Sequence, residues 1–373
     1  MTLHILHTLI PLYLYHLGLS PAVLGFLVAF PSLFQTFMRV PAGMASDRWG
    51  EKAVLLISSG SMVLASLLFL PRILALVVVA QAFTGISRCC FHPSAQSYLT
   101  RLPGLPMGTR LGLYNSMSGL GSVIGPVTAG FAIGGLGYDG AFVVFTASAV
   151  ACFTAVLLLP PAAQAQAARP THSMLEGLAE MLRIKPVLLA AGGRYAAALP
   201  MALVGSFLPV YLRQVGMTPE NVGVITGMRG FSIMIASLVF AYLYNRMRKP
   251  TVWLIGMLGT GAAVALIPTF STFWPLVMCT AVLGFSSSPL QILPTDMVIS
   301  NTPADQRGVA IAIIGSMWGL SLFLTPLLFG VLAQVTSLEV CFFVAAVPLL
   351  AMGMLTGPLF KWAYGVGEAP ATG

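Results

Sequence analysis

The chain has 373 residues, of which 57% are hydrophobic and only 8% are charged, and its net charge is +8. A soluble domain carries about 25% charged residues, so this composition excludes a water-covered globular surface and predicts a protein embedded in the lipid bilayer. The positive charge then has an explanation in membrane topology and implies no nucleic-acid partner.

Signatures of enzymes and of cofactor sites are missing from the sequence. It contains no Walker phosphate loop, no His-Glu-x-x-His and no Gly-x-Ser-x-Gly. The cysteines all fall in apolar segments and have no metal-ligand spacing: Cys89, Cys90, Cys152, Cys279 and Cys341. We therefore predict that the chain is not an enzyme and binds neither a cofactor nor a metal.

Apolar runs between polar breaks predict twelve membrane spans, because about 20 helical residues cross the hydrocarbon layer. The predicted spans are 1–17, 21–46, 53–70, 73–99, 111–134, 139–159, 187–212, 222–244, 251–270, 273–300, 309–334 and 339–360. The first is short and has no basic flank, which favours either a start upstream of Met1 or a helix that begins among the headgroups. It lacks the charged region of a signal peptide.

Basic residues are distributed unequally between the two sets of loops. Twelve lie on one side: Arg48, Lys52, Arg101, Arg110, Arg169, Arg183, Lys185, Arg246, Arg248, Lys249, Arg307 and Lys361. The opposite loops hold only Arg72 and Arg213. Since basic loops are retained in the cytoplasm, we predict a multi-pass protein of the inner (plasma) membrane with both termini cytoplasmic.

The loop after the second span reads Gly-Met-Ala-Ser-Asp-Arg-Trp-Gly-Glu-Lys and contains Gly43, Asp47, Arg48, Gly50 and Lys52. It resembles the signature loop Gly-x-x-x-Asp-Arg-x-Gly-x-Arg/Lys of the major facilitator superfamily, at the same place in the order of spans. The resemblance implies that Asp47 and Arg48 lock two helix bundles together on the cytoplasmic face. The alternative is a polar turn that serves topology alone.

The fourth span carries a row of polar and small residues, namely Gln81, Gly85, Arg88, His92 and Gln96. On a helix they fall within an arc of about 80°. Lipid would not tolerate such a face, so we expect it to line a central cavity, with Arg88 binding substrate together with Gln81 and Gln96. An imidazole titrates near neutral pH, which makes His92 the first candidate for a proton carrier; a neutral, structural histidine is the alternative. The adjoining Phe-His-Pro resembles fosmidomycin-resistance-type exporters.

The fifth span contains Gly121, Gly125, Pro126 and Gly130. This spacing resembles the Gly-x-x-x-Gly-Pro-x-x-Gly-Gly motif of antiporter-type exporters and departs from it at Ala129. The resemblance implies export. Small residues at every fourth position also allow close helix packing, so a packing face without bearing on direction is the alternative.

The two halves of the sequence repeat each other. Gly18-Leu19-Ser20-Pro21 recurs as Gly216-Met217-Thr218-Pro219, and Pro126 with Gly130 recurs as Pro326 with Gly330. A parallel repeat of six spans predicts two pseudo-symmetric six-helix bundles, which is also the fold of the major facilitator superfamily. We expect bundles over 1–159 and 187–364, a cytoplasmic linker over 160–186 and a tail over 365–373.

Other polar residues within the spans extend the candidate site. We expect Arg194, Arg229, Gln291 and Tyr13 to bind substrate, and Asp296 and His16 to be the next candidates for proton coupling after His92. Arginines inside a membrane cost roughly 2.5–3.5 kcal/mol each, and Asp296 is the one acid inside a span, the other acids being in loops or at span ends. This excess of positive charge must meet water, backbone carbonyls or an anionic ligand.

These features favour a monomeric secondary transporter that works by alternating access and exports a small anionic or zwitterionic solute. It would be an antiporter coupled to protons or another ion. An exporter of neutral lipophilic compounds is the alternative within transport, because the spans are rich in Met and Phe. A membrane sensor that transports nothing is the alternative from another class.

Overall fold

The computed structural model describes residues 1–38, 41, 45–46, 48–71, 73–101, 107–160, 181, 183–303 and 307–365. Over these residues the fold is helical throughout, without strands. Long apolar segments form helices because each backbone N–H and C=O must be satisfied within the segment when no water is near.

The first half contains five described helices. They are α1 (Thr2–His16), α2 (Pro21–Phe37), α4 (Glu51–Phe69), α5 (Leu74–Arg101) and α6 (Met107–Leu157). The last of these is two spans joined without a loop, since Gly137 breaks it with a φ of 67° and a ψ of −174°. Positive φ is accessible to glycine because it has no Cβ. The break lies between the predicted fifth and sixth spans.

The second half contains α8 (Lys185–Gln214), α9 (Pro219–Leu243), α10 (Lys249–Leu266), α11 (Phe273–Ser287), α12 (Pro289–Ser300), α13 (Arg307–Val335), α14 (Leu338–Met354) and α15 (Thr356–Tyr364). Short 3-10 turns follow α9 and α10, at Tyr244–Arg246 and Ile267–Thr269. Helices α11 and α12 together make one 28-residue span, and α15 bends away from α14 by 59°.

The described helices amount to the twelve predicted spans. Eight helical segments are long and apolar enough to cross a membrane by themselves, and the bent pair α14–α15 makes a ninth. One of the eight is α6, which Gly137 divides in two. The shorter helices α1 and α2, with 15 and 17 residues, complete the set. The prediction of a polytopic all-α protein with 12 spans is confirmed. The last predicted span is wrong in detail, because the helix turns at Leu355 rather than continuing straight to residue 360.

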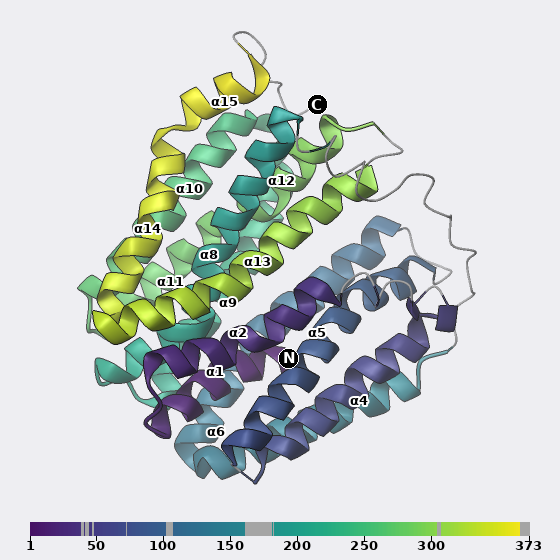
Figure 1. The fold of residues 1–373 in the computed structure, drawn as a ribbon, viewed down its shortest axis with the longest axis vertical. Coiled ribbons are helices and arrows are strands. Elements are labelled where there is room, and N and C mark those ends of the chain that lie inside the picture. The colour runs from purple at the N-terminus through teal and green to yellow at the C-terminus, as the bar shows by residue number, and fades with distance from the viewer. Residues whose placement is uncertain are drawn as a thin grey trace.

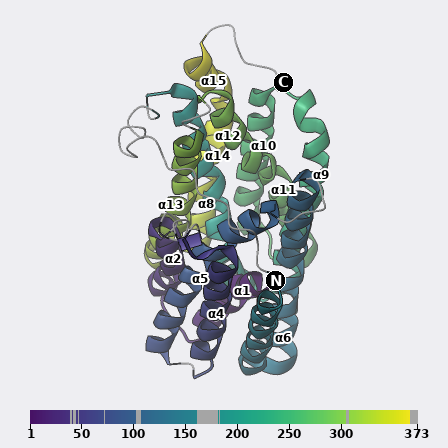
Figure 2. The same cartoon turned by 90° about the vertical axis from the view of Figure 1, so that its right-hand side faces the viewer.

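The helices form two bundles (Figure 1), α1–α6 drawn in purple and blue and α8–α15 in teal to yellow. Helices α2 and α13 pack together along one side of the junction, and α6 and α9 along the other, as the two views agree (Figures 1 and 2). We call the end that holds the turns at residues 17–20 and 215–218 the turn end. The opposite end, where α6 finishes and α8 begins, is the linker end.

Pairs of glycines bring the bundles into contact toward the turn end. A Cβ on Gly25 would lie 2.1 Å from the carbonyl oxygen of Pro326, and one on Gly130 would lie 2.4 Å from that of Pro219. For the partner glycines, Gly330 and Gly223, the corresponding distances to a backbone oxygen are 2.7 and 2.6 Å. Since all these neighbours are backbone atoms, only glycine allows helices to come so close.

The hydrophobic cores differ between the two ends. Toward the turn end, one continuous core joins both bundles and contains Leu9 and Tyr13 of α1 with Phe207 and Tyr211 of α8. Toward the linker end, the cores are separate: one lies around Trp253 in the second bundle, and smaller clusters lie in the first. The molecule is therefore sealed between its bundles at the turn end, and the space between them lies toward the linker end.

Candidate functional site: a basic central cavity

A cavity of about 500 Å³ lies between the bundles. Helices of both bundles contribute to its wall, and its basic side chains are His4, His7, Arg88, His92, Arg194 and Arg229. None of the acids within the described ranges lines it. A cavity with this lining favours negative charge, because each guanidinium offers up to five N–H donors and no acceptor.

Arg88 projects into the cavity from the middle of α5 and contacts a histidine of α1. Its Nη2 donates to Nε2 of His7, so the contact ties α5 to α1. His4, one turn before His7, stands with its ring edge-on to that of His7, with 5.5 Å between the centroids. Spacing of three residues on a helix puts both imidazoles on the face of α1 that meets the cavity.

His92 lies one turn beyond Arg88 on the same face of α5 and is exposed to the cavity. Its Nδ1 is 2.7 Å from the hydroxyl oxygen of Tyr114 on α6. This contact orients the His92 ring toward α6. Of the two imidazole rings next to Arg88, that of His92 is more exposed than that of His7.

The second bundle contributes two arginines. Arg194 donates from Nη1 to the backbone carbonyl oxygen of Gln291, at 2.9 Å, and its guanidinium lies 4.3 Å from the centre of the Trp318 ring. Stacking on an aromatic face and a carbonyl bond both stabilise a guanidinium without a carboxylate. Arg229, from the middle of α9, has a buried Nε that no described residue accepts from.

Five predicted site residues thus meet in one cavity: Arg88, His92, Arg194, Arg229 and Gln291. Thr295, one turn after Gln291 on α12, lines it as well. The remaining predicted substrate and proton residues lie elsewhere in this conformation.

Gln81 and Tyr13 are buried in helix contacts instead of lining the cavity. Gln81 donates from Nε2 to the carbonyl oxygen of Leu27 in α2, at 2.8 Å. The expected polar stripe of α5 is therefore covered in its first half, because α2 packs on it there, and Gly85 permits that approach. Tyr13 belongs to the shared core, where its ring meets Phe142 edge-on. Gln96 is exposed beyond His92 and is not part of the lining.

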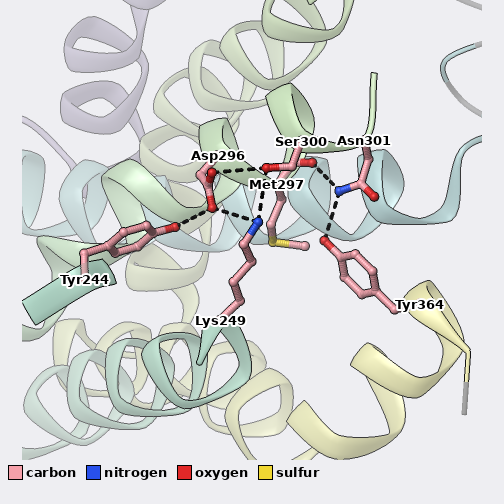
Figure 3. Close-up of polar contacts among 7 residues, drawn as sticks. All are labelled: Tyr244, Lys249, Asp296, Met297, Ser300, Asn301 and Tyr364. Carbon is pink, nitrogen blue, oxygen red and sulfur yellow. Dashed lines mark hydrogen bonds and ion pairs between the residues drawn. The ribbon is translucent and has the colours of Figure 1, made fainter. Parts of the chain in front are cut away.

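Neither of the alternative proton carriers reaches the cavity. His16 is exposed at the turn end of α1 and stacks on Tyr138, with 4.6 Å between the ring centroids. Asp296 faces the linker end of the second bundle, where it pairs with Lys249 at 2.9 Å and accepts from the hydroxyl of Tyr244 at 2.8 Å (Figure 3). An acid already engaged by a lysine and a tyrosine is a structural group in this conformation.

The signature loop is described in part. Gly43 and Asp47 lie outside the described residues. Arg48 is exposed, Lys52 is half-buried, and Gly50 precedes α4 with a φ of 83°. Only glycine adopts this backbone conformation without strain, which gives a physical reason for the glycine at that place in the loop.

The fifth-span motif packs against two helices at once. A Cβ on Gly121 or Gly125 would lie 2.6 Å from an atom of Met1 or His4 respectively, both at the start of α1. Gly130, on the other hand, meets α9 at Gly223. The motif therefore packs α6 both on its own bundle and on the other one.

The lining residues that were not predicted include His4, His7 and Trp318. The sequence does indicate that the two histidines line a polar space, because two imidazoles three residues apart in an apolar helix must share a face. No feature of the sequence indicated that Trp318 lines a cavity, because it follows the apolar pattern of its span.

A second, smaller pocket of about 260 Å³ adjoins the cavity inside the first bundle. It shares His4 and His92 with the cavity, and its remaining wall includes Met62, Phe91 and Met117. It offers an apolar side chamber next to the basic one.

Known proteins resemble this chain in sequence and in fold. Residues 1–215 and 190–371 match the family model described as Major Facilitator Superfamily. The multidrug efflux pump Tap of Mycolicibacterium fortuitum is 24% identical, over 92% of this chain and 88% of its own. Multidrug resistance protein 2 of Bacillus subtilis is 22% identical over the same shares. The crystal structure of the nucleoside transporter NupG superposes with a TM-score of 0.82 at 14% identity, covering 96% of this chain and 97% of that one, which is a likeness of fold.

Proposed function

Since this chain belongs to the Major Facilitator Superfamily, we propose that it is a secondary transporter that carries a small anionic or zwitterionic solute by alternating access. The observation that carries the proposal is the lining of the central cavity, with three arginines and three histidines and no carboxylate among the described residues. A cationic solute would meet repulsion there.

Both bundles contribute to the proposed anion site. Arg88 comes from the first bundle, and Arg194 and Arg229 come from the second. A guanidinium engages a carboxylate or phosphate through two parallel hydrogen bonds, so an anion held by Arg88 and Arg229 would bridge the bundles. A solute that bridges them can change which end is open, because it favours the arrangement in which both arginines reach it.

An alternating-access mechanism is consistent with the difference between the turn end and the linker end of the molecule. The turn end is sealed by a shared core and by glycine contacts, and the cavity lies toward the linker end. In the proposed cycle these contacts separate while the linker end closes. We further propose that the signature loop, with Asp47 and Arg48, contributes to that closure.

We propose that the linker end faces the cytoplasm, because the sequence predicts twelve basic loop residues on that side and two on the other. A cysteine at exposed Arg183 should then react only with a membrane-permeant reagent, and one at exposed Ser271 with an impermeant reagent as well. The reverse pattern would invert the orientation.

The proposed direction is export, in line with the fifth-span motif and with relatives named as efflux pumps. An antiporter would exchange the solute for a second anion or another ion. One chain forms the whole cavity, so we propose a monomer.

Binding to the purified protein tests the anion site. We expect members of a panel of sulfate, methylphosphonate and succinate to bind, and lipophilic cations not to. Arg88→Lys should weaken binding, because it keeps the charge but loses the fork, and Arg88→Ala should weaken it at least about tenfold, which is about 1.4 kcal/mol. Arg246→Gln is the control, since Arg246 lies at the linker end over Tyr242, outside the cavity. Normal anion binding by Arg88→Ala would contradict the proposal.

Export of neutral lipophilic compounds is the second candidate. The apolar pocket beside the cavity supports it, as do the relatives named for multidrug efflux. Replacing Met117 with Gln would place an amide in that pocket. If this lowers the binding of a neutral dye and Arg88→Ala does not, the second candidate is the better one.

A further inference from the structure

The contact between Arg88 and His7 fixes the protonation state of the histidine. A guanidinium only donates hydrogen bonds, and here Nη2 of Arg88 meets Nε2 of His7. Nε2 must therefore accept, and the ring carries its single proton on Nδ1. The contact exists only while His7 is neutral.

Protonation of His7 would break this contact. An imidazolium has N–H groups at both ring nitrogens, so it cannot accept from Arg88, and two touching cations repel each other. Arg88 would then be free to turn both of its terminal nitrogens into the cavity. Conversely, an anion that draws Arg88 away leaves Nε2 without its donor and places a negative charge beside the ring.

The surroundings of His7 make its proton depend on such an anion. The charged and titratable groups that share the cavity with it are His4 on its own helix, Arg88 and His92 on α5, Arg194 on α8 and Arg229 on α9. The polar lining residues of α2 are Ser32 and Gln35, which carry no charge, and α12 and α13 contribute no charged group. Helix α6 contributes Ser118, and its Tyr114 hydrogen-bonds His92. In the described part of the chain no carboxylate lines this space.

We propose that His7 is a proton-binding residue of the transport cycle, and that one proton and an anionic solute occupy the cavity together. The inference rests on the proposed function, since it requires an anion at Arg88. Joint binding is reciprocal: the anion raises the affinity for the proton by the same factor by which the proton raises the affinity for the anion. It differs from exchange, in which solute and proton compete for one site.

Joint binding also points to the charge of the solute. Arg88 released from His7, and Arg229, whose Nε meets no acceptor among the described residues, leave two guanidinium groups available to hydrogen-bond the solute, whereas Arg194 already donates to the carbonyl oxygen of Gln291. A dianion fits them best. A dianion that leaves the cell with one proton carries one net negative charge, which a membrane potential that is negative inside drives outward. The coupling is therefore compatible with export.

The test uses anions whose own charge is constant, namely sulfate and ethanedisulfonate, so that any pH dependence belongs to the protein. For the purified wild-type chain we expect affinity to rise toward acidic pH, by up to about tenfold per pH unit, and about one proton to be taken up per anion bound. Proton uptake is read with an indicator dye in weak buffer.

Three histidine variants assign the effect. His7→Gln keeps an acceptor for Arg88 but cannot titrate, so anions should still bind, without pH dependence or proton uptake. His92→Gln should retain both, as should His16→Gln, the control outside the cavity. If binding by the wild type is independent of pH, or if His92→Gln and not His7→Gln removes the effect, the inference is overturned. Failure of the wild type to bind any anion would instead refute the proposed function.

Discussion

Lys249 and Asp296 form an ion pair of 2.9 Å near the linker end of the second bundle, and its two members differ in exposure. The side chain of Lys249 is 5% exposed and that of Asp296 is 32% exposed. The hydroxyl of Ser300 lies between them, accepting from Lys249 at 3.2 Å and donating to Asp296 at 3.2 Å (Figure 3). Such a network keeps a buried ammonium solvated by protein groups.

Asp296→Leu should therefore destabilise the fold. It would leave the buried ammonium of Lys249 without its counter-ion, which costs about 3–5 kcal/mol for a buried pair. The double variant Lys249→Met with Asp296→Leu should recover most of the loss, because it removes both charges together and leaves no unpaired ion. Melting temperature in detergent measures this, with Lys361→Met as a control on an exposed lysine. A normal melting temperature for Asp296→Leu combined with altered proton coupling would restore Asp296 as a proton carrier.

At the scale of residues, the sequence indicates candidate site residues but not the residues that they contact. Arg88, Arg194 and Arg229 were predictable, because an arginine within an apolar span needs an anion, water or carbonyls. The contact of Arg88 with His7 joins residues 81 positions apart, and no local pattern encodes it. Gln81 was placed on the correct face of its helix, but a helical wheel does not say which part of that face another helix covers.

At the scale of helices, the closest approaches between the two bundles lie where α6 crosses α9 and α2 crosses α13. Gly130 and Gly135 are both on α6, yet a Cβ on Gly130 would meet backbone atoms of α9, and one on Gly135 would meet nothing within 4 Å. The two glycines therefore form a matched pair for testing whether the crossing holds the turn end closed.

Gly130→Ala should shift the molecule away from the conformation with a closed turn end. The added methyl group cannot fit 2.4 Å from the carbonyl oxygen of Pro219, so the helices must separate. Spin labels at exposed Leu17 and Val335, one in each bundle, should show a longer distance and a population ratio changed by about tenfold or more, for a cost of about 1.4 kcal/mol. Gly135→Ala should leave the distribution unchanged. The same distribution in both variants would mean that this crossing does not hold the end closed.

Helix boundaries were predictable to different degrees. The predicted spans 111–134 and 139–159 put the break between the fifth and sixth spans at residues 135–138, and it lies at Gly137. The break at Ser288 within the tenth span was not predicted, although Pro289 favours the start of a new helix there. The bend of 59° before α15 was also not predicted. Beyond the bend, Phe360 packs edge-on against Trp253, a tertiary contact that no local pattern encodes.

At the scale of the whole molecule, the two-bundle architecture followed from the internal repeat and the count of spans. The repeat predicts the same fold for each half, but not which end of the molecule is closed. That depends on the shared core around Tyr13 and Tyr211, where side chains of both halves meet. The repeat also does not make the halves chemically alike, since Glu51 and Lys249 are matched at the repeat offset of 198 residues and carry opposite charges.

The central claim is that this basic cavity moves an anion from one side of the membrane to the other. Counterflow in proteoliposomes tests it most directly, because it needs neither a known driving ion nor a known direction. Vesicles that contain the purified wild-type protein and an excess of unlabelled anion should accumulate the labelled anion transiently. Arg229→Ala should lower the initial rate at least about tenfold, with protein-free vesicles as the blank. Exchange of a neutral lipophile without exchange of any anion, or binding of anions without any exchange, would contradict the account.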